Sequence, residues 1–245
     1  MNSWTAMKDW PESLTKLLGN REMDVGKESR ESVQLAEYLQ FGKEGTSNPS
    51  DLSASPLYIF DSSVFDDVSE LLCHFHVPFI FPKDDGLMHV IFSSKVFQPE
   101  YRWLLIGHKN SGFGIHIDPF NTHAWNALIV GRKRWALLPP STSPEVALSC
   151  FTKSAAVWFK ERDKQSNTSF PGLIEFEQVA GEIVFIPNSW WHVALCLELS
   201  IAVTYNYLGE DSLQEVILLN KKIGGEAEDV AKRWEERLKQ QGSTC

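Results

Sequence analysis

The stretch GFGIHIDPFNTHAWNALIVGRKRW, residues Gly112–Trp135, determines how the rest of the chain is interpreted. Within it His116 and Asp118 stand two residues apart, beside the β-branched Ile115 and Ile117, and this pattern predicts a strand. Alternate residues of a strand face the same side, so we expect the imidazole and the carboxylate to project into one space. This pair is a candidate for two of the ligands of a metal ion.

Two histidines and one carboxylate form the facial triad of non-haem Fe(II) oxygenases, which leaves metal positions open for oxygen and a co-substrate. His192, in NSWWHVAL, lies on a separate apolar run and is the candidate for the third ligand. The alternatives are a structural His–Asp hydrogen bond at 116 and 118, and a capped core histidine at 192. The other histidines are expected not to bind metal: His74, His76, His89, His108 and His123.

From Leu57 onward the chain is a series of short β-rich runs separated by Gly, Pro, Asn and Ser. The runs are LYIF, YRWLLIG, GIHID, WNALIV, KRWALL, LIEFEQV, EIVFI, WHVAL and SIAVTYNY. Runs with this spacing predict an all-β barrel or jelly roll. VFDDVSELLCHF predicts a helix between them, and the long connection 139–172 is expected to hold a short helix through Ala155–Phe159 and to face the substrate.

Two segments resemble the Jumonji-C (JmjC) oxygenases: HIDPFNTHAWNALIVGRKRW at 116–135 and GEIVFIPNSWWHVALCLELSIAVTYN at 181–206. The resemblance is to the branch of the bifunctional arginine demethylase and lysyl hydroxylase, once called the phosphatidylserine receptor, and it extends over roughly Trp4–Trp234. It implies a mainly β fold with flanking helices around a double-stranded β-helix, the jelly roll of cupins. It also implies a reaction that uses Fe(II), 2-oxoglutarate and O2, with ascorbate in support.

The same resemblance implies which residues hold 2-oxoglutarate. Lys133 alternates with Trp135 and Leu137 on its strand, so it is expected to point inward, and a buried lysine needs an anionic partner. We therefore expect Lys133 to pair with the far carboxylate of 2-oxoglutarate. Thr204 and Tyr58 correspond to family residues that contact this carboxylate, Tyr58 from outside the barrel. For Lys133 and Tyr58 the alternative is a position on the protein surface.

In this branch, asparagines that match Asn126 and Asn206 face the metal-side end of the co-substrate. The alternative is that they are core amides that satisfy backbone groups. Phe113 departs from the family, because its relatives have a small hydroxyl residue three positions before the first ligand. A phenyl ring there is expected to narrow the co-substrate pocket or to reshape the substrate entrance.

The bulk composition is that of a globular domain long enough to bury a sizeable core: 245 residues, 43% hydrophobic and 22% charged. The net charge of −9 argues against direct nucleic-acid binding and suits a basic protein or peptide substrate, although simple solubility is the alternative explanation of this charge. Four cysteines without C-x-x-C spacing favour reduced thiols and an intracellular protein, nuclear or cytoplasmic. No signal peptide or membrane-spanning apolar run is expected.

We expect three parts in one compact unit: a helical and strand support layer over 1–56, the JmjC core over 57–208, and C-terminal helices over 209–245. In the first part, an amphipathic helix is predicted over 28–43. In the last, an apolar stripe predicts packing on the barrel or on a second copy as a homodimer: Val230, Trp234 and Leu238.

The leading hypothesis is an oxygenase that hydroxylates a protein side chain, with lysine favoured. Removal of a methyl group from N-methyl-arginine or methyl-lysine, as in histones, is the first alternative, since the same iron site performs both. A JmjC binding module without turnover would usually have lost a metal ligand or the lysine. A cupin-type metalloenzyme that does not use 2-oxoglutarate would have no reason to bury Lys133 and Thr204 together.

Overall fold

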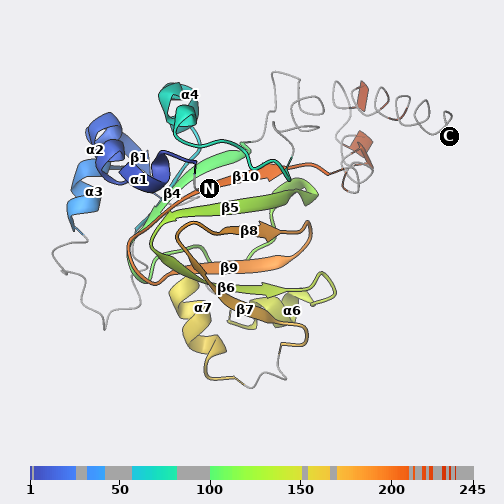
Figure 1. The fold of residues 1–245 in the computed structure, drawn as a ribbon. Helices are drawn as coiled ribbons and strands as arrows, with labels where there is room; N and C mark the ends of the chain where they lie inside the picture. Colours follow the sequence, from blue (N-terminus) through green and yellow to red (C-terminus); the bar gives the residue numbers. More distant parts are fainter. Residues whose placement is uncertain are drawn as a thin grey trace.

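The computed structural model describes the following parts of the chain: residue 1, residues 3–25, 32–41, 57–81, 100–150, 154–165 and 170–209, and single positions between 212 and 235. Within them, two antiparallel sheets of five and three strands form the centre of the molecule, with helices on their outer sides (Figure 1). The prediction of a mainly β jelly roll with flanking helices is confirmed. In the described part of the chain, no helix has the length and apolar character needed to cross a membrane.

The larger sheet has the strand order β3-β4-β10-β5-β8. The bounds of these strands are Tyr58–Asp61 (β3), Arg102–Gly107 (β4), Ser200–Tyr207 (β10), His123–Val130 (β5) and Ile183–Ile186 (β8). The smaller sheet has the order β7-β6-β9. Its strands are Ile174–Val179 (β7), Arg132–Leu138 (β6) and Trp191–Cys196 (β9).

The chain passes from the larger sheet to the smaller one between β5 and β6, at Gly131. Gly131 has φ +89°, and a Cβ atom there would lie 2.1 Å from the carbonyl oxygen of Leu199. Only glycine adopts this conformation in so close an approach without strain. The turn therefore fixes Lys133 two residues into β6, on the face of the smaller sheet that meets the larger one.

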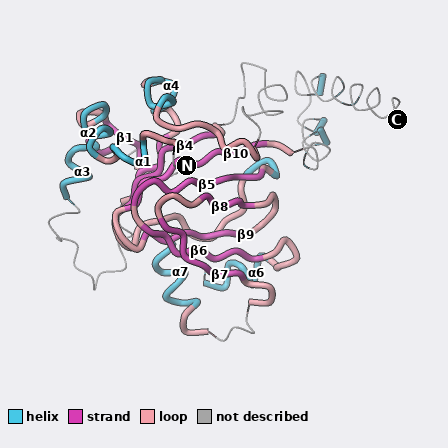
Figure 2. Tube along the Cα trace, viewed as in Figure 1, coloured by secondary structure: helices cyan, strands magenta, loops and turns pink. Residues whose placement is uncertain are grey.

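The outer face of the larger sheet packs against the N-terminal helices α1 (Ala6–Asp9), α2 (Glu12–Leu18) and α3 (Leu35–Phe41), which lie beside it in Figure 2. Alternate residues of β10 divide between the faces, so Val203 joins this outer core whereas Ala202 lies on the inner face. The resulting core is continuous from the helices into the sheet.

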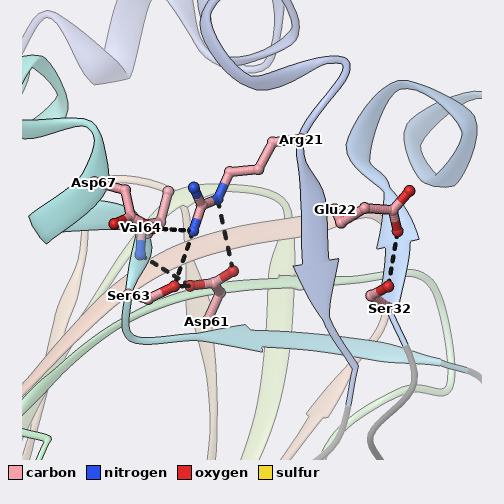
Figure 3. Close-up of polar contacts among 7 residues, drawn as sticks. All are labelled: Arg21, Glu22, Ser32, Asp61, Ser63, Val64 and Asp67. Carbon is pink, nitrogen blue, oxygen red and sulfur yellow. Dashed lines mark hydrogen bonds and ion pairs between the residues drawn. The ribbon is translucent and has the colours of Figure 1, made fainter.

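Arg21 joins the N-terminal layer to the segment after β3 (Figure 3). Its guanidinium donates to Ser63 Oγ at 2.8 Å and to Asp67 Oδ2 at 2.7 Å, on and beside α4 (Val64–Asp67). The buried Asp61 accepts from the Val64 backbone N–H at 2.9 Å, which caps that helix. These contacts place β3, and with it Tyr58, at the edge of the larger sheet.

The outer face of the smaller sheet is covered by α7 (Ala155–Arg162), with α6 (Pro144–Ala147) beside it (Figure 2). The predicted helix through residues 155–159 is therefore confirmed. Arg134 of β6 forms two hydrogen bonds with the Asp163 carboxylate, at 2.7 and 2.9 Å, just beyond the end of α7. The long connection over residues 139–172 is thus attached to the smaller sheet, which also carries Lys133.

Three predicted elements differ from the structure. Residues 32–34 form the strand β2 (Ser32–Gln34), which pairs with β1 (Glu22–Asp24), so the helix predicted over 28–43 begins only at Leu35. The predicted strand around His116 is an extended segment with two isolated pairings, Phe113 with Ser154 and His116 with His192. VFDDVSELLCHF divides into α4 and a 3₁₀ turn, Ser69–Cys73.

The proposed boundaries at 57 and 209 stay predictions. Most of the predicted C-terminal helices lies outside the described residues, and so does the apolar stripe assigned to them: Val230, Trp234 and Leu238. His89 also lies outside them.

Candidate metal and co-substrate site

The three predicted metal ligands come together at the edge of β9. His116 and His192 pair through two backbone hydrogen bonds, with N···O distances of 3.0 and 2.8 Å. The Nε2 atom of each ring lies 3.7 Å from Oδ1 of Asp118, which is two residues beyond His116. Among the described residues, these three form the group of His, Cys and acidic side chains able to hold a metal ion, with ligand atoms within 4.8 Å of one another.

Backbone carbonyls orient both imidazoles. Nδ1 of His116 lies 2.9 Å from the Gly114 oxygen, and Nδ1 of His192 lies 3.1 Å from the Trp190 oxygen. A carbonyl only accepts, so Nδ1 carries the proton in each ring and the lone pair resides on Nε2, the atom that faces Asp118. Metal-binding histidines use this arrangement to fix the tautomer and the direction of the ligand atom.

The spacing fits a metal ion better than a structural His–Asp hydrogen bond. A separation of 3.7 Å is too long for a hydrogen bond. Two atoms that each lie about 2.1 Å from one ion, at right angles, are about 3.0 Å apart, so a small movement brings all three ligands into range. The side chain of His116 is 34% exposed and that of His192 is 7% exposed, so the site opens toward His116.

Lys133 lies inside the protein, so the alternative surface position is excluded. It is 1% exposed, and its Nζ donates to the Tyr58 hydroxyl at 3.3 Å. Among the residues that the structure describes, no carboxylate lies within ion-pair distance of this amine. Burial lowers the pKa of Lys133, as expected for an amine without an anionic partner.

Tyr58 points into the space between the sheets from β3. β3 pairs with β4 and so extends the larger sheet at its edge, and the expected contact of Tyr58 with the co-substrate from outside the barrel stays a prediction. Burial raises the pKa of Tyr58 well above its ordinary value, so the side chain is a neutral hydroxyl at physiological pH. The hydroxyl can accept from Lys133 and donate to a ligand.

Thr204 and Asn126 lie opposite each other on β10 and β5, on the same inner face. Thr204 Oγ1 donates to the Trp125 oxygen at 2.9 Å, so its lone pairs stay directed to the interior. Asn126 is 2% exposed, and its side-chain oxygen has no hydrogen-bond partner among the residues that the structure describes. A core amide that merely satisfied the backbone would not leave this atom unpaired.

Trp103 is a site residue that the sequence analysis missed. It lies opposite Thr204 on β4, so Trp103, Thr204 and Asn126 form one row across three strands. Its indole N–H is buried and has no acceptor within the described part of the chain. The alternation of Trp103, Leu105 and Gly107 in YRWLLIG was a signal that could have placed it on the inner face.

Asn206 is placed differently from Asn126. Its side-chain amide donates to Thr122 Oγ1 at 2.9 Å, beside the loop that follows Asp118. Because the Asn206 amide donates to another group of the protein, this contact agrees with the alternative that Asn206 is a core amide. The co-substrate role of Asn206 stays a prediction.

Phe113 lies on the co-substrate side of the site. Its ring packs at nearly a right angle on Tyr58, with centroids 5.2 Å apart, and on Phe60, with centroids 4.8 Å apart. Phe60 in turn stacks on Trp103 at 5.3 Å. Four aromatic rings thus contact one another in series, and Tyr58, the first of them, is the ring beside Lys133.

The histidines expected not to bind metal lie outside the cluster where the structure describes them. His108 contacts the Tyr38 backbone oxygen at 2.7 Å through Nε2. His123 accepts from the Asn188 backbone N–H through Nδ1 at 3.1 Å, and its ring is stacked near Phe185 and Tyr207.

Two facing antiparallel sheets, with two histidines and one carboxylate converging at their interior, define a metal-site jelly roll of the cupin type. The chain belongs to the family described as "Cupin-like domain", whose model matches residues 2–212.

Relatives of known name are consistent with this assignment. The chain is 34% identical over 91% of its length to "Arginine-specific demethylase JMJ22" of Arabidopsis thaliana. It is 32% identical over 98% of its length to "Bifunctional arginine demethylase and lysyl-hydroxylase psr-1" of Caenorhabditis elegans. It is 26% identical over 82% of its length to "2-oxoglutarate and iron-dependent oxygenase JMJD4" of Gallus gallus. The matches cover 43%, 61% and 48% of these proteins, respectively, so the chain corresponds to only part of each.

Proposed function

We propose that the protein is an Fe(II)- and 2-oxoglutarate-dependent oxygenase that hydroxylates a protein side chain, with lysine favoured. The observation that carries this proposal is the convergence of two histidines and one carboxylate at the interior that also holds Lys133, a buried amine without a carboxylate partner among the described residues. The names of the relatives JMJD4 and psr-1 support the same class of reaction.

In this proposal His116, Asp118 and His192 hold the iron. Bound iron, with 2-oxoglutarate and O2, supplies an oxidation that yields succinate and carbon dioxide and places one oxygen atom in the substrate. Nε2 of both histidines and the Asp118 carboxylate would supply three ligands to the iron, and a site of this kind would keep positions for 2-oxoglutarate and oxygen. Ascorbate, as a reductant, would keep the iron in the ferrous state.

The far carboxylate of 2-oxoglutarate is assigned to Lys133, with a hydrogen bond from the Tyr58 hydroxyl. Thr204 would donate to the same carboxylate by turning its hydroxyl away from the Trp125 oxygen. A carboxylate here would give the buried amine the charge partner that it lacks, and the low local dielectric would strengthen the pair. Asn126 is assigned to the metal-side end of the co-substrate, because its side-chain oxygen is buried and has no partner.

We infer a basic protein or peptide as the substrate. The net charge of −9 favours approach of Lys- or Arg-rich segments at low salt. Oxygen addition at lysine is favoured, because a demethylase must also select a methylated side chain. The free thiols of Cys73 and Cys196 support an intracellular location, nuclear or cytoplasmic, and a homodimer through the C-terminal helices stays part of the proposal.

Demethylation is the second candidate, and the names of JMJ22 and psr-1 favour it for arginine. Hydroxylation of an N-methyl carbon gives a product that breaks down to formaldehyde and the free amine. The iron site is the same for both outcomes, so the shape of the substrate pocket decides between them.

The test is mass spectrometry of Lys- and Arg-rich peptides, with and without methyl-arginine, after incubation with Fe(II), 2-oxoglutarate and ascorbate. A gain of one oxygen on lysine is expected, and loss of a methyl group from arginine would favour the second candidate. Asp118→Ala is the control and should show neither product. Absence of succinate with every peptide, while iron is bound, would overturn the oxygenase assignment in favour of a binding module.

A further inference from the structure

The ring of Tyr58 is held by contacts from two separate segments. On β4, Gly107 lies opposite Tyr58, and a Cβ atom at 107 would be 2.6 and 2.7 Å from two ring carbons. The ring therefore lies directly on the glycine backbone. Phe113 supplies the second contact, with ring centroids 5.2 Å apart at 86°.

Phe113 is itself fixed in place. Its backbone pairs with Ser154, at the start of α7, and its ring packs on Phe60 at 79°. The preceding Gly112 has φ +143°, and a Cβ atom there would lie 2.1 Å from the Ala194 oxygen, so this backbone is pressed against β9. The backbone of Phe113 is therefore fixed, and its partly buried ring is held against Tyr58 and Phe60.

We propose that Phe113 is a positioning residue that holds Tyr58 beside Lys133 and thereby restricts the site to a 2-oxo acid with five carbons. The Tyr58 hydroxyl lies 3.3 Å from the Lys133 amine, and the Phe113 and Gly107 contacts fix that position. An acid with one more methylene group would have to displace the Tyr58 ring to reach the same amine. This inference rests on the proposed 2-oxoglutarate site.

Replacement of Phe113 by alanine removes one of the two contacts that hold the ring. Tyr58 can then swing into the vacated space, which loosens its contact with Lys133 and makes room for a longer chain. We therefore expect weaker binding of 2-oxoglutarate and, relative to it, stronger binding of 2-oxoadipate. A residue that only stabilised the fold would weaken both acids alike.

The test is calorimetric titration of the Mn(II)-loaded protein with 2-oxoglutarate and with 2-oxoadipate, which measures binding without turnover. The wild-type protein should prefer 2-oxoglutarate by roughly 10- to 200-fold, the range for one methylene group in an apolar pocket. Phe113→Ala should reduce this preference at least about fivefold, and Phe113→Leu should reduce it less. Phe176→Ala is the matched control, because this phenylalanine is also partly buried but stacks on Trp135.

The outcomes separate this inference from the proposed function. A wild-type protein that binds Mn(II) but not 2-oxoglutarate would refute the co-substrate site itself. If the wild-type protein binds 2-oxoglutarate and Phe113→Ala keeps the same preference, the positioning role is wrong. Should the alanine variant not fold, an unchanged preference in Phe113→Leu overturns the inference equally.

Discussion

Lys133 shows how one side chain indicates the chemistry of its ligand. It is 1% exposed, it faces the interior, and its described polar neighbour is the neutral hydroxyl of Tyr58. A buried amine destabilises a protein unless an anion compensates it. Retention of such a group indicates a site that is completed by a bound carboxylate.

Lys133→Met should remove the charge partner of the bound carboxylate, and so weaken 2-oxoglutarate binding, without destabilising the ligand-free protein. Loss of the buried pair corresponds to roughly 3–5 kcal/mol, and at 1.4 kcal/mol per tenfold this weakens 2-oxoglutarate binding by roughly 100-fold or more. Mn(II) affinity should be unchanged, and the melting temperature without ligand should not fall. Arg132→Met, on the same strand but exposed, is the control. A change of less than threefold in 2-oxoglutarate affinity would place the anchor elsewhere.

The pH dependence of stability follows from the same residue. Burial lowers the pKa of Lys133 below its ordinary value of 10.5, which the unfolded chain keeps. Between the two values the unfolded state binds more protons, so this group makes the ligand-free protein more stable as pH rises. Urea unfolding across this pH range measures the free energy of unfolding of the wild type and of Lys133→Met. The difference between these two free energies should shrink toward high pH. A constant difference would contradict the assignment.

Gln178 of β7 joins the two sheets. It is fully buried and accepts from the Trp135 indole N–H at 2.8 Å. Its own amide donates to the backbone oxygens of Asn126 at 3.0 Å and Glu182 at 3.1 Å. One side chain thus fixes β7 and β6 of the smaller sheet against β5 of the larger one.

Gln178→Leu keeps the volume but removes this partner from two buried polar groups, the Trp135 indole N–H and the Asn126 backbone oxygen, whereas the Glu182 oxygen still accepts from the Leu128 N–H. Each such group costs about 1–3 kcal/mol, so with partial relaxation we expect the free energy of unfolding to fall by about 2–5 kcal/mol. Denaturant unfolding measures this change. Gln34→Leu, on the β2 hairpin, is the control and should stay within about 0.5 kcal/mol of the wild type. Equal effects at both positions would show that Gln178 does not join the sheets.

The strands of the core could be predicted from the sequence because each is a short apolar run bounded by turn residues. The inward direction of Lys133 followed from period-two alternation on β6. The helix predicted over 28–43 began too early, because residues 32–34 satisfy their backbone groups by pairing with β1. That pairing depends on tertiary contact, which local periodicity does not encode.

In the candidate site, too, some features could be predicted from the sequence and others could not. The H-x-D spacing predicted that His116 and Asp118 lie together, and the structure brings them beside His192, although the strand expected around His116 is present only as an isolated pairing with β9. The row formed by Trp103, Thr204 and Asn126 depends on the register of three strands from distant parts of the chain. The contact between Phe113 and Tyr58 likewise joins β3 to a loop more than fifty positions later. Neither could be derived from residue spacing alone.

For the molecule as a whole, metal binding should appear as added thermal stability. At a Mn(II) concentration of 100 times the dissociation constant, one site stabilises the folded state by about 2.7 kcal/mol. For a chain of this length that corresponds to a rise in melting temperature of roughly 5–10 °C. Differential scanning fluorimetry with Mn(II), and then with a chelator, measures it. Asp118→Ala should show no rise, and an equal rise in this variant would place the metal elsewhere.

The paired backbone of His116 and His192 has a consequence for how the protein acquires its metal. Two segments 76 positions apart are joined by reciprocal hydrogen bonds that do not involve the ligand atoms. The protein therefore does not have to order these segments when the ion binds. No part of the binding free energy is spent on ordering them, so the affinity for the ion is higher. Exchange of one divalent ion for another then needs only small side-chain movements. We therefore expect the site to bind several divalent ions, with metal supply, ligand type and site geometry together deciding which one is resident.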